Sequence, residues 1–217
     1  IVNRGGSLEL SKLTPNCGRF GFYNFLANGF VVVGSQYRGN DGGQGKEEFG
    51  GADVNDVLNL IPLVKSLEYI DTNNIFMLGE SRGGMTTYLA LKQGIKVNAV
   101  AVIGGLSDLA ANLSTFPELL PRWSKIIPTL KQNQDKCLRD RSAVFWADKL
   151  NVPILVLHGG ADWRTNLETQ TMALIRQLRV HQKAHKLIVY QEDDHFLSFN
   201  REESERQIIQ WFKSYFR

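Results

Sequence analysis

The chain has 217 residues, of which 43% are hydrophobic, and its formal net charge is +3. This length and composition suffice for one well-packed core, and charges of both signs are mixed along the chain without the basic stripe of a nucleic-acid-binding protein. The longest uncharged apolar runs, at 30–33 and 97–103, fall far short of a membrane span. We therefore expect neither nucleic acid nor a membrane as a partner.

The beginning of the chain indicates that more sequence precedes it. The chain opens at Ile1 without a methionine or a secretory signal pattern, and it starts inside a strand-like segment. We expect further strands upstream. Cys17 and Cys137 lack the spacing of a disulfide framework or a metal site, and we interpret them as buried or idle thiols. The cellular compartment stays open, with a slight preference for the cytoplasm.

Strand-like and helix-like segments alternate along the chain. The expected strands lie at 30–35, 75–78, 97–103, 154–157 and 187–190, and the expected helices at 54–67, 85–92, 167–178 and 202–216. Strands that are apolar on both faces and separated by helices predict an α/β fold with a mostly parallel, doubly wound sheet, covered by helices on both faces. In such sheets the functional site lies beyond the carboxyl ends of the strands.

The stretch 106–150 interrupts this alternation. It carries three prolines among aromatic and charged residues, and it lies between two expected strands. An insert of this size on the carboxyl side of the sheet can roof the site and line a pocket. We therefore expect a single catalytic domain over 1–217, with 106–150 as a candidate cap. Phe145 and Trp146 are interpreted as ordinary packing.

The run Gly79-Glu80-Ser81-Arg82-Gly83 stands between an expected strand and an expected helix. A serine at such a junction occupies a tight, strained turn, because glycines on either side remove Cβ atoms where strand and helix nearly touch. The turn presents the hydroxyl beyond the sheet edge, within reach of a base. Ser81 is therefore the predicted nucleophile.

A serine hydroxyl needs a base to take its proton and a third group to orient that base. His195 follows the last expected strand and shares the sheet edge with Ser81, so it is the predicted base. His181 and His185 precede that strand and fall on the opposite side of the sheet. His158 closes a strand before two glycines and is interpreted as shaping a turn.

The predicted acid is Asp162, which follows the strand at 154–157 and completes the chain order serine, acid, histidine. It would hold one imidazole tautomer and favour the imidazolium that forms on proton transfer. Asp108 stands at the same edge and is the second candidate. Asp193 and Asp194 are too close to His195 in sequence to swing beneath it, and we assign them to the loop surface.

Negative charge that develops on a substrate oxygen needs hydrogen-bond donors. The backbone N–H of Arg82, at the start of a helix, is the expected first donor. The second donor is expected from the loop after the first strand-like segment, where Gly5 and Gly6 let the backbone approach a substrate closely.

Two other glycine-rich patterns fail on spacing. Residues 42–46 hint at a phosphate-binding loop, but Asn40 stands where glycine is needed and Glu47 where serine or threonine is needed. Residues 79–84 lack the dinucleotide-binding register, because Ser81 takes the place of the middle glycine. No metal or organic cofactor is expected, since the predicted mechanism requires neither.

Five sequence blocks resemble, in order, the catalytic domain of the prolyl oligopeptidase family of α/β-hydrolases. They are Tyr37-Arg38-Gly39, the residues 50–56, 79–84 and 158–164, and Asp194-His195. The resemblance implies an α/β-hydrolase fold and cleavage of peptide bonds, often in oligopeptides, whereas close relatives hydrolyse esters.

Two departures from the family pattern bear on the substrate. The family's peptidases commonly place a tyrosine in the loop after the first strand, and its hydroxyl serves the oxyanion hole. Arg4 takes that place here, so Arg4 itself or an amide of Gly5 or Gly6 would substitute. In addition, no segment of these 217 residues resembles the propeller domain that selects substrate size in the family.

The resulting hypothesis is a serine hydrolase that forms an acyl-enzyme on Ser81, with a peptidase of the prolyl oligopeptidase type preferred. A carboxylesterase on the same fold is the alternative, and a non-catalytic binding protein is a remote one. Glu80 is a candidate contact for a substrate amine, or else it steadies the turn at Ser81 through a hydrogen bond. Arg164 is a candidate contact for a substrate carboxylate or carbonyl, or else a brace of its loop through a nearby carboxylate.

Overall fold

The computed structural model describes residues 1–8, 10–14 and 22–217. Within these ranges, parallel strands form a five-stranded sheet in the order β1-β2-β3-β4-β5. The strands are β1 (Val2–Asn3), β2 (Phe76–Glu80), β3 (Ala99–Ile103), β4 (Ile154–Gly159) and β5 (His185–Tyr190). The three central strands are buried along their whole length. This burial agrees with their apolar sequences, because both faces of a parallel sheet are covered.

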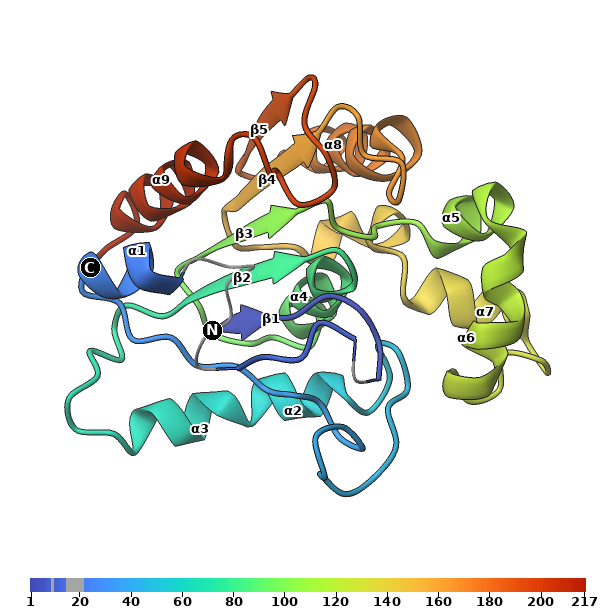
Figure 1. Cartoon of the computed structure of the whole chain (residues 1–217), viewed down its shortest axis with the longest axis horizontal. Helices are drawn as coiled ribbons and strands as arrows, with labels where there is room; N and C mark the ends of the chain where they lie inside the picture. The colour runs from blue at the N-terminus through green and yellow to red at the C-terminus, as the bar shows by residue number, and fades with distance from the viewer. Residues whose placement is uncertain (9, 15–21) are drawn as a thin grey trace.

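Helices cover both faces of the sheet (Figure 1). One face carries α1 (Phe22–Ala27) and α9 (Arg201–Lys213), and the other carries α2 (Val54–Leu58), α3 (Leu60–Lys65), α4 (Arg82–Lys92) and α8 (Ala173–Val180). Side chains of β2 alternate between the two cores: Phe76 packs with α1 and α9, whereas Met77 packs with α2, α4 and α8. The alternation follows from the two-residue period of a strand.

The stretch 106–150 lies beyond the carboxyl ends of the strands, on the right of Figure 1. It forms α5 (Leu109–Thr115), α6 (Leu120–Ile126) and α7 (Gln134–Asp140), with 3₁₀ turns η1 (Pro117–Leu119), η2 (Ala143–Phe145) and η3 (Ala147–Lys149). Trp146 is buried in the core of this side, as expected. Phe145 is largely exposed, with the Arg139 guanidinium 4.2 Å from its ring centre.

The strand order reverses beside β1. The amide of Val2 donates to the carbonyl of Val33 at 2.8 Å, and Val2 forms a parallel bridge with Gly34, on the edge of β1 that faces away from β2. The chain thus leaves β1 on one side and returns to β2 on the other. Such a reversal opens a crevice at the carboxyl ends of the strands, where the loop after β1 and the turn after β2 meet.

Three predicted elements differ from the structure. The segment 30–35 is not a strand, because its neighbour β1 is too short to pair with more than Gly34. The helix expected at 54–67 is divided into α2 and α3, because Pro62 has no N–H to donate to the carbonyl of Leu58. The helix expected at 167–178 begins as a π-helical segment, η4 (Leu167–Met172), whose Gln170 carbonyl accepts a hydrogen bond from the Ser107 hydroxyl at 2.7 Å.

Within the described ranges, none of the helices combines the length and the apolar character that are needed to cross a bilayer.

Gly83 sets how closely α4 approaches β1. A Cβ at this position would lie 1.9 Å from the Asn3 carbonyl oxygen and 2.8 Å from that of Arg4. Because backbone would have to move, Gly83→Ala is expected to lower the free energy of unfolding by about 3 kcal/mol. Gly94→Ala, at a positive φ with open space around it, should cost only about 1 kcal/mol of backbone strain. Urea unfolding of both variants checks this, and equal losses would contradict the close approach.

Candidate active site

Ser81 lies between β2 and α4 with φ of 55°, in the left-handed region that non-glycine residues rarely adopt. Its amide donates to the carbonyl of Ile103 at 2.9 Å, and its carbonyl accepts from the amides of Gly84 and Leu106. The tight turn around Ser81 requires glycine at position 79, because a Cβ there would lie 2.5 Å from the Gly83 carbonyl oxygen. The backbone thus fixes Ser81 at the carboxyl end of β2.

His195 and Asp162 form a close pair on the same side of the sheet. His195 Nδ1 lies 2.7 Å from Asp162 Oδ2, and their side chains are 4% and 0% exposed. Asp162 follows β4 and His195 follows β5. The structure therefore brings together two side chains 33 positions apart, in an arrangement that fixes one imidazole tautomer.

The Asp162 carboxylate is surrounded by donors. Its Oδ1 accepts from the amides of Arg164 at 2.8 Å and Thr165 at 2.9 Å, and its Oδ2 accepts from the Thr165 hydroxyl at 2.5 Å as well as from His195. Burial alone would raise the pKa of Asp162, but the hydrogen bonds and charge of His195 and the hydrogen bonds of Thr165 outweigh it. The pKa of Asp162 therefore lies below its ordinary value, and the group is ionised near neutral pH.

His158 supports the loop that carries Asp162. It is fully buried in β4, with Nε2 at 3.0 Å from the Thr165 carbonyl oxygen and Nδ1 at 2.8 Å from the Thr171 hydroxyl. A carbonyl oxygen only accepts, so Nε2 carries the proton and Nδ1 accepts from Thr171. Burial lowers the pKa of His158, which keeps this ring neutral. Its contacts agree with the turn-shaping role predicted from the sequence.

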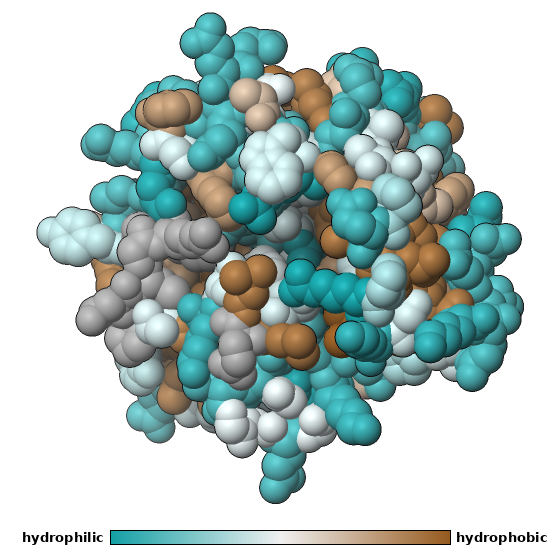
Figure 2. Space-filling model, turned by 45° about the vertical axis from the view of Figure 1, so that its right-hand side comes forward, coloured by the Kyte–Doolittle hydropathy of each residue, from teal (hydrophilic) through white to brown (hydrophobic). Residues whose placement is uncertain are grey.

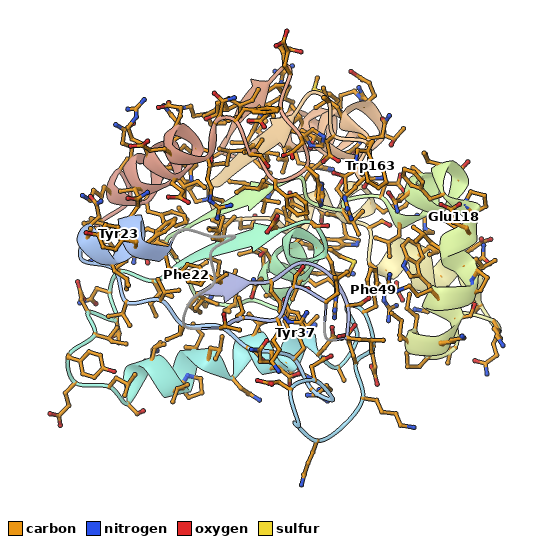
Figure 3. All side chains as sticks on the ribbon, in the orientation of Figure 1. Phe22, Tyr23, Tyr37, Phe49, Glu118 and Trp163 are labelled. Carbon is orange, nitrogen blue, oxygen red and sulfur yellow. The ribbon has the colours of Figure 1, made fainter. Side chains whose placement is uncertain are left out.

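Ser81 and His195 line one pocket of about 300 Å³. The loop after β1, the stretch 106–123 and the loop 163–165 form its walls, and in Figure 3 three lining residues, Phe49, Glu118 and Trp163, come from three separate segments on the carboxyl side of the sheet. Figure 2 turns this side forward and shows apolar side chains among hydrophilic ones near its centre. A larger hollow of about 480 Å³ lies at the opposite end of the sheet and contains none of the predicted site residues.

The residues of the expected oxyanion donors belong to the same pocket. A Cβ on Gly5 would lie 3.3 Å from Ser81 Cβ, so the backbone after β1 passes directly beside the serine. Gly6 has φ of +66°, in the left-handed region that glycine adopts readily. Arg82 begins α4, and the first amides of a helix lack partners within the helix. Gly5, Gly6 and Arg82 all line the pocket.

The prediction that Arg4 contacts substrate is wrong. Its side chain is fully buried, and its guanidinium donates to the carbonyls of Leu8, Leu10 and Gln36, each at 2.8 Å. Buried carbonyl oxygens need donors, and Arg4 supplies several at once. It therefore holds the loop after β1 from behind.

Glu80 and Arg164 both line the pocket, at different depths. Glu80 is buried at the end of β2, whereas Arg164 is exposed. The Arg164 guanidinium lies 4.6 Å from the ring centre of Trp163 and 5.5 Å from that of Phe196. In the part of the chain that the structure describes, it forms no ion pair, so a brace through a carboxylate is not what holds it.

The other aspartates have structural tasks. Asp108 caps α5 by accepting from the amide of Ala111 at 3.0 Å. Asp193 is 1% exposed, so its assignment to the loop surface was wrong. It accepts from the amides of Phe199 and Asn200 and thereby ties the His195 loop to the start of α9. Asp194 is half-buried and accepts from the amides of Phe196 and Ser198.

A buried charge network lies behind the serine turn. The Arg82 guanidinium is 2.7 Å from Glu47 and 2.5 Å from Asp53, and it lies over the rings of Tyr37 and Phe49. Burial, the largest effect, raises the pKa of Tyr37 to about 12, so its ring stays neutral there. The side chain of Arg82 thus anchors the start of α4.

Several residues of the site were missed by the sequence analysis. They are Phe49, Asn112 and Thr165, whereas Phe116 and Trp123 belong to the aromatic residues of the stretch that was predicted to line a pocket. Thr165 falls one position beyond the block 158–164, whereas Phe49 lies in a loop and Asn112 in the short helix α5, and neither segment has a clear periodic pattern. Of the two cysteines, Cys137 is buried and unbridged, and Cys17 lies outside the described residues. Within the described ranges, no cluster of histidine, cysteine and acidic side chains could hold a metal ion.

Comparisons with known proteins agree with this arrangement. A family profile described as the prolyl oligopeptidase family matches residues 19–217. The chain is 25% identical over 212 residues to the uncharacterized peptidase YtmA of Bacillus subtilis, covering 97% of this chain and 81% of that protein. It is 25% identical over 200 residues to dipeptidyl-peptidase 5 of Porphyromonas endodontalis, covering 88% of this chain and 28% of that protein.

Among solved structures, the acylaminoacyl peptidase of Pyrococcus horikoshii is similar with a TM-score of 0.71 and 21% identity. The match covers 83% of this chain and 31% of that one. At this level of identity the likeness shows the fold, which is that of the α/β-hydrolases. The chain spans less than a third of this protein and of dipeptidyl-peptidase 5.

The buried network predicts a large loss of stability when its arginine is removed. Arg82→Met would remove the arginine that lies between the buried carboxylates of Glu47 and Asp53, and we expect it to lower the free energy of unfolding by about 3–5 kcal/mol. Lys136→Met removes the exposed partner of Asp140 and should cost about 0.5 kcal/mol or less. Urea unfolding at neutral pH compares the two variants, and a similar small loss in both would refute the structural importance of the network.

Proposed function

The chain belongs to the prolyl oligopeptidase family of serine hydrolases, and we propose that it is a peptidase that cleaves small peptides through an acyl-enzyme on Ser81. The observation that carries the proposal is the His195–Asp162 pair at 2.7 Å, whose histidine shares a pocket with a serine held at φ of 55°. These are the three chemical roles that acyl transfer requires.

In the proposed mechanism, the Ser81 hydroxyl attacks the carbonyl carbon of the scissile bond. His195 receives its proton through Nε2, because Nδ1–H is committed to Asp162. The ionised Asp162 stabilises the imidazolium without taking the proton. His195 then protonates the leaving amine, and water releases the acyl group by the same steps in reverse order.

The developing oxyanion would be bound by two backbone amides. One is that of Arg82 at the amino end of α4, and the other is that of Gly5 or Gly6. This proposal is supported by the passage of Gly5 beside Ser81 and by the position of Arg82 at the first residue of α4. One such donor typically contributes a factor of about 10²–10³ in rate.

The walls of the pocket favour a large apolar side chain on the acyl side of the bond. Phe49 and Trp123 pack against each other with ring centres 5.4 Å apart, and Phe116 lines the same space. The Asn112 side chain lines this pocket, and the residue is 4% exposed. Within the described ranges its side-chain amide has no hydrogen-bond partner, so it can bind a polar group at the end of a substrate side chain. Asn112, Phe116 and Trp123 come from the stretch 106–150, which supports its proposed role as a cap. Glu80 and Arg164 remain candidate contacts for the substrate amine and carbonyl.

A carboxylesterase is the second candidate. One observation favours it: the residue in the place of the family's oxyanion tyrosine is Arg4, whose side chain lies behind the loop and offers no donor to the pocket. Esters are easier to cleave than amides, so they tolerate a weaker oxyanion hole. A non-catalytic binding protein is disfavoured, because nucleophile, base and acid positions are all occupied by suitable side chains.

Labelling tests the nucleophile. A fluorophosphonate probe is expected to modify Ser81, because the reaction uses the same base and oxyanion donors as acylation. Ser81→Ala should abolish labelling and reduce turnover by about 10⁶-fold. Ser114→Ala, at an exposed position of α5, is the matched control and should label normally. Unchanged labelling of the Ser81 variant, read by mass spectrometry of the modified peptide, would refute the assignment.

Paired substrates separate the two enzymatic functions. N-acyl phenylalanine as an activated ester and as an anilide, together with a proline-containing anilide, would be assayed side by side. The peptidase proposal predicts hydrolysis of at least one anilide with kcat/KM well above that of the Ser81→Ala variant. Hydrolysis confined to the ester would establish the carboxylesterase instead.

A further inference from the structure

Thr165 contacts the proposed catalytic acid and base through both its side chain and its backbone. It is 2% exposed. Its hydroxyl oxygen lies 2.5 Å from Asp162 Oδ2 and 3.4 Å from His195 Nδ1, and its amide donates to Asp162 Oδ1 at 2.9 Å. Its carbonyl accepts from the ring of His158 at 3.0 Å. No other side chain of the described residues hydrogen-bonds to both Asp162 and His195.

The direction of these hydrogen bonds follows from the groups involved. His195 Nδ1 carries a proton and donates it in the hydrogen bond to Asp162, so this nitrogen cannot accept a hydrogen bond from the Thr165 hydroxyl. An ionised carboxylate only accepts, so the hydroxyl donates to Oδ2. Asp162 Oδ2 is therefore shared by two donors, Thr165 and His195, and the carboxylate as a whole accepts four hydrogen bonds.

We propose that Thr165 is a positioning residue that lowers the basicity of His195 by sharing Asp162 Oδ2. The hydroxyl draws negative charge away from the oxygen that faces the imidazole. The imidazolium is then stabilised less than it would be by a carboxylate with no other donor on that oxygen. The mechanistic meaning of this inference rests on the proposed function, since only then does the basicity of His195 set a reaction rate.

Among the described residues, few other charged or titratable groups lie near His195, so the effect of Thr165 on its basicity can be measured separately. Asp162 is the carboxylate in contact with it, and Asp194 is the adjacent residue. Glu80 and Arg164 line the same pocket. The second imidazole, His158, has its Nε2 3.7 Å from Asp162 Oδ2, but it is neutral and donates to the Thr165 carbonyl. His158 thus fixes the backbone of Thr165 without competing as a charge.

The test is a pH titration of the His195 ring by NMR, which needs no substrate. The Cε1 resonance would be assigned by its loss in His195→Gln. Thr165→Val keeps the shape and the backbone bonds but removes the hydroxyl, and it should raise the titration midpoint of His195 by about 0.5–1 pH unit. Thr165→Ser keeps the hydroxyl and should leave the midpoint unchanged. If the valine variant fails to fold, Thr165→Ala provides the same comparison.

The control is Thr72→Val, at a half-buried position before β2 on the opposite end of the sheet, which should not move the midpoint. An unchanged or lowered midpoint in a folded Thr165→Val or Thr165→Ala protein would overturn the inference. In an active enzyme, the acidic limb of kcat/KM should shift to higher pH by the same amount as the midpoint. A shifted midpoint without any hydrolysis would retain the inference and reject the proposed function, so the two failures are distinguishable.

Discussion

The close approach of α4 to β1 and β2 is the constraint on which the rest of the site depends. It is possible only because Gly79 and Gly83 lack side chains at points where backbone and backbone nearly touch. The chain must therefore turn within one residue, and Ser81 takes the left-handed conformation that completes the turn. The same contact brings the loop after β1 beside Ser81. The packing of α4 against β1 and β2 thus places the proposed nucleophile and the proposed oxyanion donors together.

Two arginine side chains, Arg4 and Arg82, are buried beside this close contact. Arg82 begins α4 with a buried side chain that donates to the carbonyl of Gly6, and the buried Arg4 lies behind the loop after β1. Glu47 lies near both guanidinium groups, at 2.7 Å from Arg82 and 4.0 Å from Arg4. The charge network therefore joins the two backbone segments that flank Ser81. This explains why a residue other than tyrosine can follow β1: at this position Arg4 supports the backbone instead of contacting the pocket.

The positions of Ser81, Asp162 and His195 could be predicted because each follows a buried apolar strand, and the carboxyl ends of parallel strands meet at one edge. The same reasoning placed His185 on the opposite side, at the start of β5. It failed for Arg4 and Asp193, whose partners are backbone groups of irregular loops. No periodic pattern records which loop carbonyl or amide will be left without a partner. It also failed for the segment 30–35, because an apolar run forms a strand only where a neighbouring strand is long enough to pair with it, and β1 has two residues.

The surroundings of Asp162 indicate which property of an acid matters most in this arrangement. A carboxylate with a single hydrogen bond to the imidazole would attract the imidazolium most strongly, yet here three further donors compete for its oxygens. Each of them weakens that attraction and also removes a way for the side chain to rotate. With its carboxylate oxygens accepting four hydrogen bonds, Asp162 can present Oδ2 to His195 in only one geometry. In the proposed mechanism, the main task of Asp162 is therefore to orient His195, and its attraction for the imidazolium is weaker as a result.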